Sequence, residues 1–240
     1  MHKPLNRRYE VFNSEKTEEI AYLKAATSYH LTYRGHHRHQ VELAKQAYQD
    51  FIALYPNSDR VPRAKMNLLG IALELARMDE KGFDEVIKIG ESLLADYPDA
   101  NDYIRSRASL IVAESYYEGE NKDYVKTIEA CDNILEEFIS SEHRSAIGTA
   151  FRLKAYSLYF LNRYEEAAAN FTMVIEFWQN PDYHFDYQVE ENLAAAYYWR
   201  GNALKNQGLQ SAAKADFQTV VERYPENAFA EWANNELSNL

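Results

Sequence analysis

The stretch GNALKNQGLQSAAKADFQTVVERYP, residues 201–225, decides the fold of this 240-residue chain. Four of its residues follow one another at intervals of 3, 4 and 7 positions: Gln210, Ala213, Phe217 and Tyr224. Such intervals place side chains on one face of an α-helix. Pro225 ends that helix, because proline lacks the N–H that a continuing helix needs. The stretch therefore predicts an amphipathic helix that docks on a preceding helix at 187–207.

The same pattern of four positions occurs four more times in the chain. Its members are Val41/Ala44/Tyr48/Tyr55, Phe83/Val86/Gly90/Tyr97, Tyr124/Thr127/Cys131/Phe138 and Tyr164/Ala167/Phe171/Trp178. The terminal aromatic residues are 42, 41, 40 and 46 positions apart. In front of each patterned segment a first helix is predicted, at about 15–34, 61–79, 102–118, 145–162 and 187–207. The chain is thus expected to fold as five helix–turn–helix units, with Cys131 packed in the core.

The composition favours the same fold class. Glycine and proline contribute only 8 and 6 residues, about half of their usual share. A β-sandwich or barrel needs far more turn residues and is excluded. The composition also disfavours disorder, because 46% of the residues are hydrophobic. The chain is predicted to be all-α.

The residues of the last unit identify a family. Gly201, Ala203, Leu204, Gly208, Ala213, Phe217, Val220 and Pro225 are spaced as in tetratricopeptide repeats. The chain resembles this family over about residues 15–227. The resemblance implies a right-handed α-solenoid. Its predicted parts are an N-terminal extension at 1–14, hairpins at 15–56, 61–98, 102–139, 145–179 and 187–225, and a capping helix at 228–240.

The length of the units resembles a subset of that family. The usual period is 34 residues, whereas the spacing here is 40 to 46. Long units whose joints read like 55–64 and 224–233 resemble bacterial envelope proteins. These are the outer-membrane assembly lipoproteins of BamD type and the Tol-associated periplasmic coordinators. The resemblance implies a place in a bacterial envelope complex.

No catalytic motif is found, neither a glycine-rich phosphate loop nor a nucleophile elbow. The expected function is a non-catalytic scaffold without a cofactor, which binds a protein or peptide on its concave face. A cytoplasmic adaptor of a secretion or motility machine is the alternative. Since 1–9 lack an apolar segment, a periplasmic or outer-membrane location requires that a signal was removed; otherwise the chain is cytoplasmic. The longest apolar run, Leu193–Trp199, is too short for membrane insertion.

Tyrosine and arginine on the first helices are the candidate contacts, since both residue types are common at interfaces. Aligned on the family pattern, the residues expected on the concave face are Tyr117, Arg152, Tyr156, Tyr159, Tyr198, Asn202 and Lys205. The alternative is that about half of such residues are buried between helices.

The formal charge of −11 predicts a basic or amphipathic partner segment, bound less tightly as salt rises. Nucleic acid is not expected as a partner, because no basic run is longer than Arg7-Arg8. Exposed terminal repeats can also stack, so a homo-oligomer stays open.

A metal-binding function at residues 30–39 is the alternative of a different class. Four histidines lie there, and His36, His39 and Glu42 are spaced i, i+3, i+6, so a helix could present all three to one ion. Gly35 and Arg38 favour an exposed, solvated turn instead.

Overall fold

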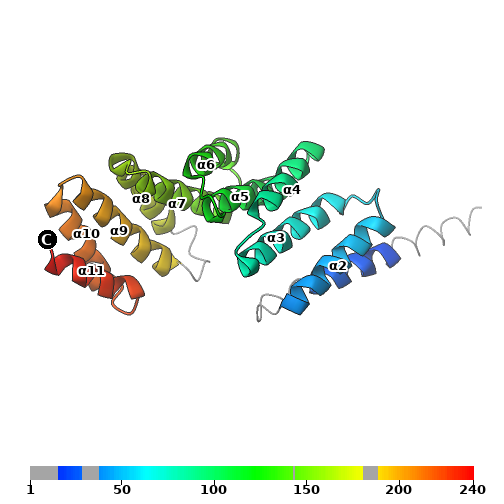
Figure 1. The fold of residues 1–240 in the computed structure, drawn as a ribbon, viewed down its shortest axis with the longest axis horizontal. Coiled ribbons are helices and arrows are strands. Elements are labelled where there is room, and N and C mark those ends of the chain that lie inside the picture. Colours follow the sequence, from blue (N-terminus) through cyan, green and yellow to red (C-terminus); the bar gives the residue numbers. More distant parts are fainter. Residues whose placement is uncertain (1–15, 29–37, 143, 181–188) are drawn as a thin grey trace, which may run out of the picture. The chain divides into compact units, whose positions relative to one another are not determined.

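The computed structural model describes residues 16–28, 38–142, 144–180 and 189–240, which are helical with short connections and no strand. A first helix covers residues 16–28. It is followed by α2 (Arg38–Leu54), α3 (Val61–Asp79), α4 (Phe83–Asp96), α5 (Asp102–Glu118), α6 (Tyr124–Phe138), α7 (Arg144–Phe160), α8 (Tyr164–Gln179), α9 (Val189–Asn206), α10 (Gln210–Arg223) and α11 (Ala228–Ser238) (Figure 1). The predicted all-α fold of helix–turn–helix repeats with a C-terminal helix is confirmed.

The chain forms two compact units, residues 1–115 and 116–240. The first unit holds the helix at 16–28, α2, α3, α4 and most of α5. The second holds α6 to α11. The predicted extension at 1–14 lies outside the described residues, and the predicted division into five hairpins and a cap stays a prediction.

The residues of the repeated pattern form the core. Tyr48, Phe171 and Phe217 are fully buried, each between the helices of its own hairpin and a neighbour. The buried free thiol of Cys131 confirms that this residue packs in the core. In the second unit one continuous hydrophobic cluster runs from α6 to α11. Within each unit, burial against the next helix therefore holds successive helices together.

A buried ion pair joins three helices of the second unit. Arg200 of α9 donates two hydrogen bonds to the carboxylate of Asp216 in α10, at 2.7 and 2.8 Å. A third nitrogen of the same guanidinium donates to the hydroxyl of Thr172 in α8, at 3.0 Å. The side chain of Asp216 is only 7% exposed. The pair thus satisfies two charges that would be costly to bury separately.

The start of α2 differs from the sequence prediction. Arg38 and His39, which were expected in an exposed turn, are the first two residues of the helix. The Arg38 side chain bonds to Glu42 one turn further on and also pairs with Asp79 at the end of α3. These two ion pairs favour helix at a position where glycine and histidine nearby suggest a turn.

Within the described part of the chain, no helix combines the length and the hydropathy needed to cross a bilayer.

Gly201 of α9 lies where α9 and α10 approach each other closely. A Cβ atom at this position would lie 2.7 Å from the ring of Phe217, which is fully buried and cannot move away. We expect Gly201→Ala to lower the free energy of unfolding by about 1–3 kcal/mol, the usual cost of overpacking. Urea denaturation followed by circular dichroism measures it. The control is Gln218→Ala on the exposed side of α10, and a Gly201→Ala value equal to this control would contradict the close packing.

Candidate protein-binding surface

Aromatic side chains of the second unit form a continuous surface over the first helices of its hairpins. We call it the aromatic surface. Its members are Tyr117, Tyr124, Tyr156, Tyr159, Phe160, Tyr198, Trp199, Phe229 and Trp232. They come from the end of α5, from α6, α7 and α9, and from the C-terminal helix α11.

Trp199 lies at the centre of the aromatic surface. Its ring centroid is 5.1 Å from that of Tyr159, 5.6 Å from that of Tyr156 and 6.0 Å from that of Phe160. On the other side it is 5.6 Å from the ring of Tyr198. All four pairs meet edge to face, the arrangement that aromatic rings prefer. Trp199 therefore connects α7 and α9 across the surface.

The contacts extend to both ends of the second unit. At one end Tyr117 packs on Tyr156 and on Tyr124, with ring centroids 6.4 and 5.8 Å apart. At the other end Tyr198 packs on Phe229 and Trp232 of α11, at 5.4 and 5.8 Å. The C-terminal helix thus adds to this surface besides covering the last hairpin.

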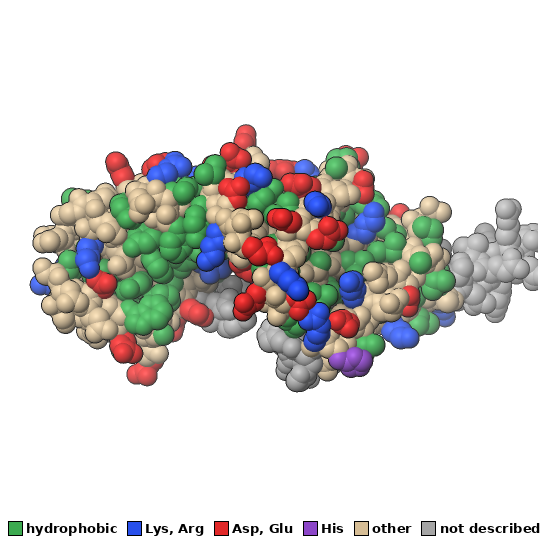
Figure 2. Space-filling view, viewed as in Figure 1, with side chains coloured by type: hydrophobic (Ala, Val, Ile, Leu, Met, Phe, Trp, Pro, Cys, Tyr) green, Lys and Arg blue, Asp and Glu red, His purple; other side chains and the backbone are tan. Residues whose placement is uncertain are grey.

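The aromatic surface is open to solvent in part. Trp232 is 47% exposed and Phe160 is 41% exposed, while the other members are half-buried. Figure 2 shows hydrophobic side chains gathered over α9 and α11. Contiguous exposed apolar area of this kind marks interaction sites in soluble proteins, and Trp and Tyr are the residues that dominate binding energy there.

Three tyrosine hydroxyls of this surface, those of Tyr117, Tyr156 and Tyr159, stay protonated at neutral pH. Burial raises the pKa of Tyr117 and of Tyr159 above the ordinary value. Burial also raises the pKa of Tyr156, although the charge of Arg152 and its hydrogen bond to that hydroxyl act in the opposite direction. Asn206 donates to the hydroxyl of Tyr159 at 3.3 Å. The surface therefore presents neutral hydroxyl groups as hydrogen-bonding tips on apolar rings.

The structure brings together most of the residues that the sequence singled out. Tyr117, Tyr156, Tyr159 and Tyr198 all belong to the aromatic surface, and Arg152 reaches the hydroxyl of one of them. The other two predicted residues, Asn202 and Lys205, contact other parts of the chain. Asn202 is buried and donates to the backbone oxygen of Tyr198, and Lys205 pairs with Glu236 of α11. The role of all seven residues in binding stays a prediction.

Sequence reasoning missed the centre of this surface. Trp199 was only part of an apolar run, and Trp232 only part of a capping helix. Trp199 could have been selected from the sequence, because it is aromatic and lies on the first helix of its hairpin. Nothing in the local sequence shows that α11 places Trp232 beside Tyr198, since that contact joins helices far apart in the chain.

The first unit has a polar cavity of about 410 Å³ on its first helices instead. Arg60 lies over the ring of Tyr22 at 5.3 Å, and Arg63 lies over the ring of Tyr103 at 5.0 Å. Asn67 donates to the hydroxyl of Tyr48 at 2.7 Å on the same side. Arg60, Arg63 and Asp59 are the charged residues that line this cavity.

The negative charge of the chain is concentrated in the second unit. Residues 116–240 contain 20 acidic and 10 basic residues, a net charge of −10. Residues 1–115 contain the other 17 acidic and 16 basic residues, a net charge of −1. The aromatic surface therefore lies on a strongly acidic unit.

The proposed metal ligands are only partly described. His36 lies outside the described residues. His39 and Glu42 are exposed on α2, and the carboxylate of Glu42 is engaged by Arg38 at 3.0 Å. Among the described residues no group of three or more His, Cys, Asp and Glu side chains could hold a metal ion.

Comparisons with known proteins agree with this architecture. The family model for the tetratricopeptide repeat matches residues 21–58 and 195–227. Among solved structures, the nearly identical TPR-like repeats of a Podospora anserina kinesin light chain superpose with a TM-score of 0.58 at 14% identity, over 82% of this chain and 92% of that one.

A second similar structure is Bacillus thuringiensis PlcR in complex with the peptide PapR7 and DNA. It has a TM-score of 0.56 at 16% identity, over 97% of this chain and 76% of that one. A search among curated protein sequences finds no match. The family model therefore identifies tetratricopeptide repeats at residues 21–58 and 195–227.

Proposed function

We propose that the chain is a non-catalytic scaffold that binds a peptide or protein segment on the aromatic surface of its second unit. The observation that carries this proposal is the unbroken series of ring contacts centred on Trp199, with exposed members at Phe160 and Trp232. Such rings offer a large contact area at a small cost in side-chain entropy. The PlcR structure, which contains a peptide, supports the same kind of role.

The partner segment is proposed to be basic and amphipathic. The unit carries a net charge of −10, and acidic side chains lie next to the aromatic surface itself. Glu118 lies close enough to Tyr117, and Glu191 close enough to Tyr156, to raise the pKa of each hydroxyl. A lysine or arginine side chain of the partner would gain from these carboxylates and from the faces of the rings.

The setting that we propose is a multiprotein complex of the bacterial envelope. Its support is the unit spacing of 40 to 46 residues and the tyrosine–proline joints at Tyr55 and Tyr224. A cytoplasmic adaptor of a secretion or motility machine is the alternative. The cellular compartment in which the partner is found distinguishes the envelope complex from the cytoplasmic adaptor.

A selection from a random peptide library on the purified protein tests the function. We expect the enriched peptides to combine Lys or Arg with apolar residues. Their binding should quench or shift the fluorescence of Trp199 and Trp232, and their affinity should fall about tenfold or more between 50 and 500 mM salt, as expected for screened charges. Enrichment of acidic peptides, or an affinity independent of salt, would contradict the proposed partner chemistry.

A further inference from the structure

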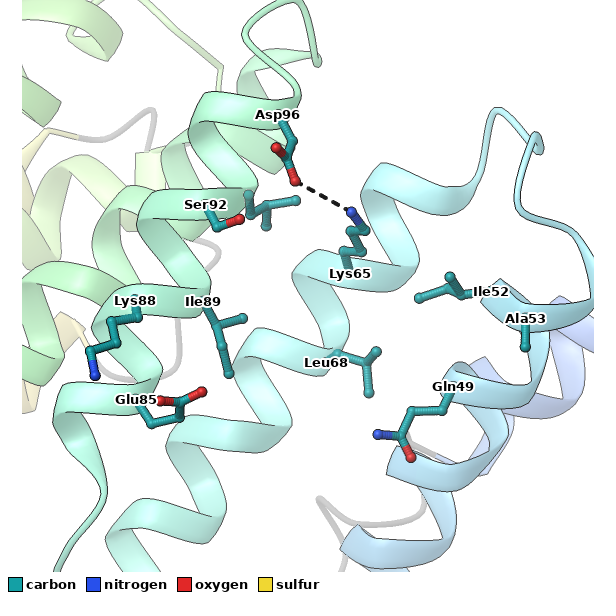
Figure 3. A pocket seen from close by; sticks show the side chains of 11 residues that line it. Gln49, Ile52, Ala53, Lys65, Leu68, Glu85, Lys88, Ile89, Ser92 and Asp96 are labelled. Atoms are coloured by element: carbon teal, nitrogen blue, oxygen red, sulfur yellow. Dashed lines mark ion pairs between the residues drawn. The ribbon is translucent and has the colours of Figure 1, made fainter.

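A groove between α2, α3 and α4 belongs to the first unit and shares no residue with the aromatic surface. Ile52 of α2, Leu68 of α3 and Ile89 of α4 face a shared cavity of about 590 Å³ (Figure 3). Lys65 and Asp96 form an ion pair of 3.5 Å along one side of it. The lining is mainly apolar although the cavity is open to solvent, and Ile89 is 38% exposed.

The groove continues along α3 into a second cavity of about 670 Å³. The two cavities share Leu68 and Ile89, so they form one continuous depression. Its floor is the stripe Leu68, Ala72 and Leu75, spaced i, i+4, i+7 on one face of α3. An amphipathic helix laid in a groove presents apolar anchors at the same spacing.

The side chains that line this groove carry a small excess of positive charge. Five basic and four acidic side chains line the two cavities, in a chain whose net charge is −11. Arg38 forms ion pairs with Glu42 and Asp79, and Lys65 forms one with Asp96. Among the lining residues, all of which the structure describes, Lys45, Lys81 and Lys88 form no ion pair, and Glu85 is the one acidic residue that forms none. Lys45 and Lys81 line the second cavity. They lie at the polar end of the groove and are available to carboxylates of a ligand.

We propose that this groove docks an acidic amphipathic helix of a partner protein, with apolar anchors on Leu68 and Ile89 and carboxylates toward Lys45 and Lys81. The charge of the ligand is opposite to that expected at the aromatic surface. The two proposed sites share no residue and would take partners of opposite charge. This proposal does not depend on the function proposed above.

The test uses the full chain and two synthetic helical peptides of about 16 residues, which is about 24 Å of helix. Both have leucines at i, i+3, i+4 and i+7, and their other positions are mostly glutamate in one and mostly lysine in the other. Fluorescence anisotropy of the labelled peptides measures the affinities at low salt. Because the lysine peptide is also expected to bind the aromatic surface, both are measured on the Trp199→Ala variant. We expect this variant to bind the glutamate peptide at least about tenfold more tightly than the lysine peptide.

Two variants assign the binding to the groove. Ile89→Asp is expected to weaken the binding of the glutamate peptide about tenfold or more. Val125→Asp should leave it unchanged, because Val125 is an exposed apolar residue of α6 that does not line the groove. The charge reversal Lys45→Glu/Lys81→Glu should abolish the preference for the glutamate peptide. The matched reversal Lys122→Glu/Lys214→Glu in the second unit should keep it. Circular dichroism confirms that each variant is folded.

Three results would overturn the proposal. The first is equal affinity of the two peptides for the Trp199→Ala variant. The second is a loss of binding in the control variants as large as in the groove variants. The third is self-association in sedimentation experiments that Ile89→Asp abolishes, which would make a second copy of the chain the occupant. If the glutamate peptide does not bind, the groove proposal fails but the function proposed for the aromatic surface is not affected. The two are separable because this test is made on the Trp199→Ala variant, in which the aromatic surface is already altered.

Discussion

Replacing Asp216 by alanine is expected to lower the free energy of unfolding by about 3–5 kcal/mol, the usual cost of removing one partner of a buried ion pair. The change leaves the Arg200 guanidinium, which lies largely between α8, α9 and α10, without its counter-ion. Two charge-assisted hydrogen bonds of 2.7 and 2.8 Å disappear with the carboxylate. Urea denaturation monitored by circular dichroism gives the value.

Two comparison variants show that the effect comes from the unpaired charge. In Arg200→Met/Asp216→Leu both charges are replaced by apolar groups, and the loss should be clearly smaller than in Asp216→Ala. Arg163→Ala removes the exposed ion pair with Glu166 and should cost at most about 1 kcal/mol. A double variant as unstable as Asp216→Ala would mean that packing, and not charge, is what Asp216 contributes.

Replacing Trp199 by alanine is expected to weaken the binding of a selected basic peptide about 30-fold or more, which corresponds to at least about 2 kcal/mol. Trp199 contacts four other rings of the aromatic surface, two of them within 5.6 Å on α7. Truncation removes the central ring and leaves its neighbours without support. Fluorescence anisotropy with a labelled peptide measures the loss, so the readout does not depend on the tryptophan itself.

The matched control is Met173→Ala on α8, a 44% exposed apolar residue outside the aromatic surface. Its affinity should equal that of the unchanged protein. Trp199→Phe keeps a ring at the centre and should recover part of the affinity. An affinity of Trp199→Ala equal to that of Met173→Ala would place binding elsewhere on the molecule, provided that denaturation shows both variants to be folded.

The helices themselves could be predicted closely from the sequence. The predicted first helices at 61–79 and 102–118 coincide with α3 and α5, and the one at 145–162 differs from α7 by one or two residues at each end. This agreement has a local cause, since helical periodicity and the proline and glycine at helix ends are written in neighbouring residues. The start of α2 was missed because Arg38 is fixed by Asp79, 41 positions later.

The candidate site was only partly predictable. Tyr156 and Tyr159 were selected because they lie on a first helix, which the repeat pattern identifies. Their meeting with Trp199, and that of Tyr198 with Trp232, joins rings from different helices. The ion pair of Arg200 and Asp216 also joins residues of different helices, and so do the residues that line the groove at Leu68.

The sequence by itself determined that this protein is an all-α array of helix–turn–helix repeats, because spacing along one helix dictates which of its faces is buried. The tertiary structure alone decided which of the remaining side chains meet. The positions of α9 and α11 bring Trp199 and Trp232 into one aromatic surface, and the separation of α2 from α4 opens the groove over α3. Such contacts depend on how whole helices pack, and the periodicity of a single helix carries no information about that packing.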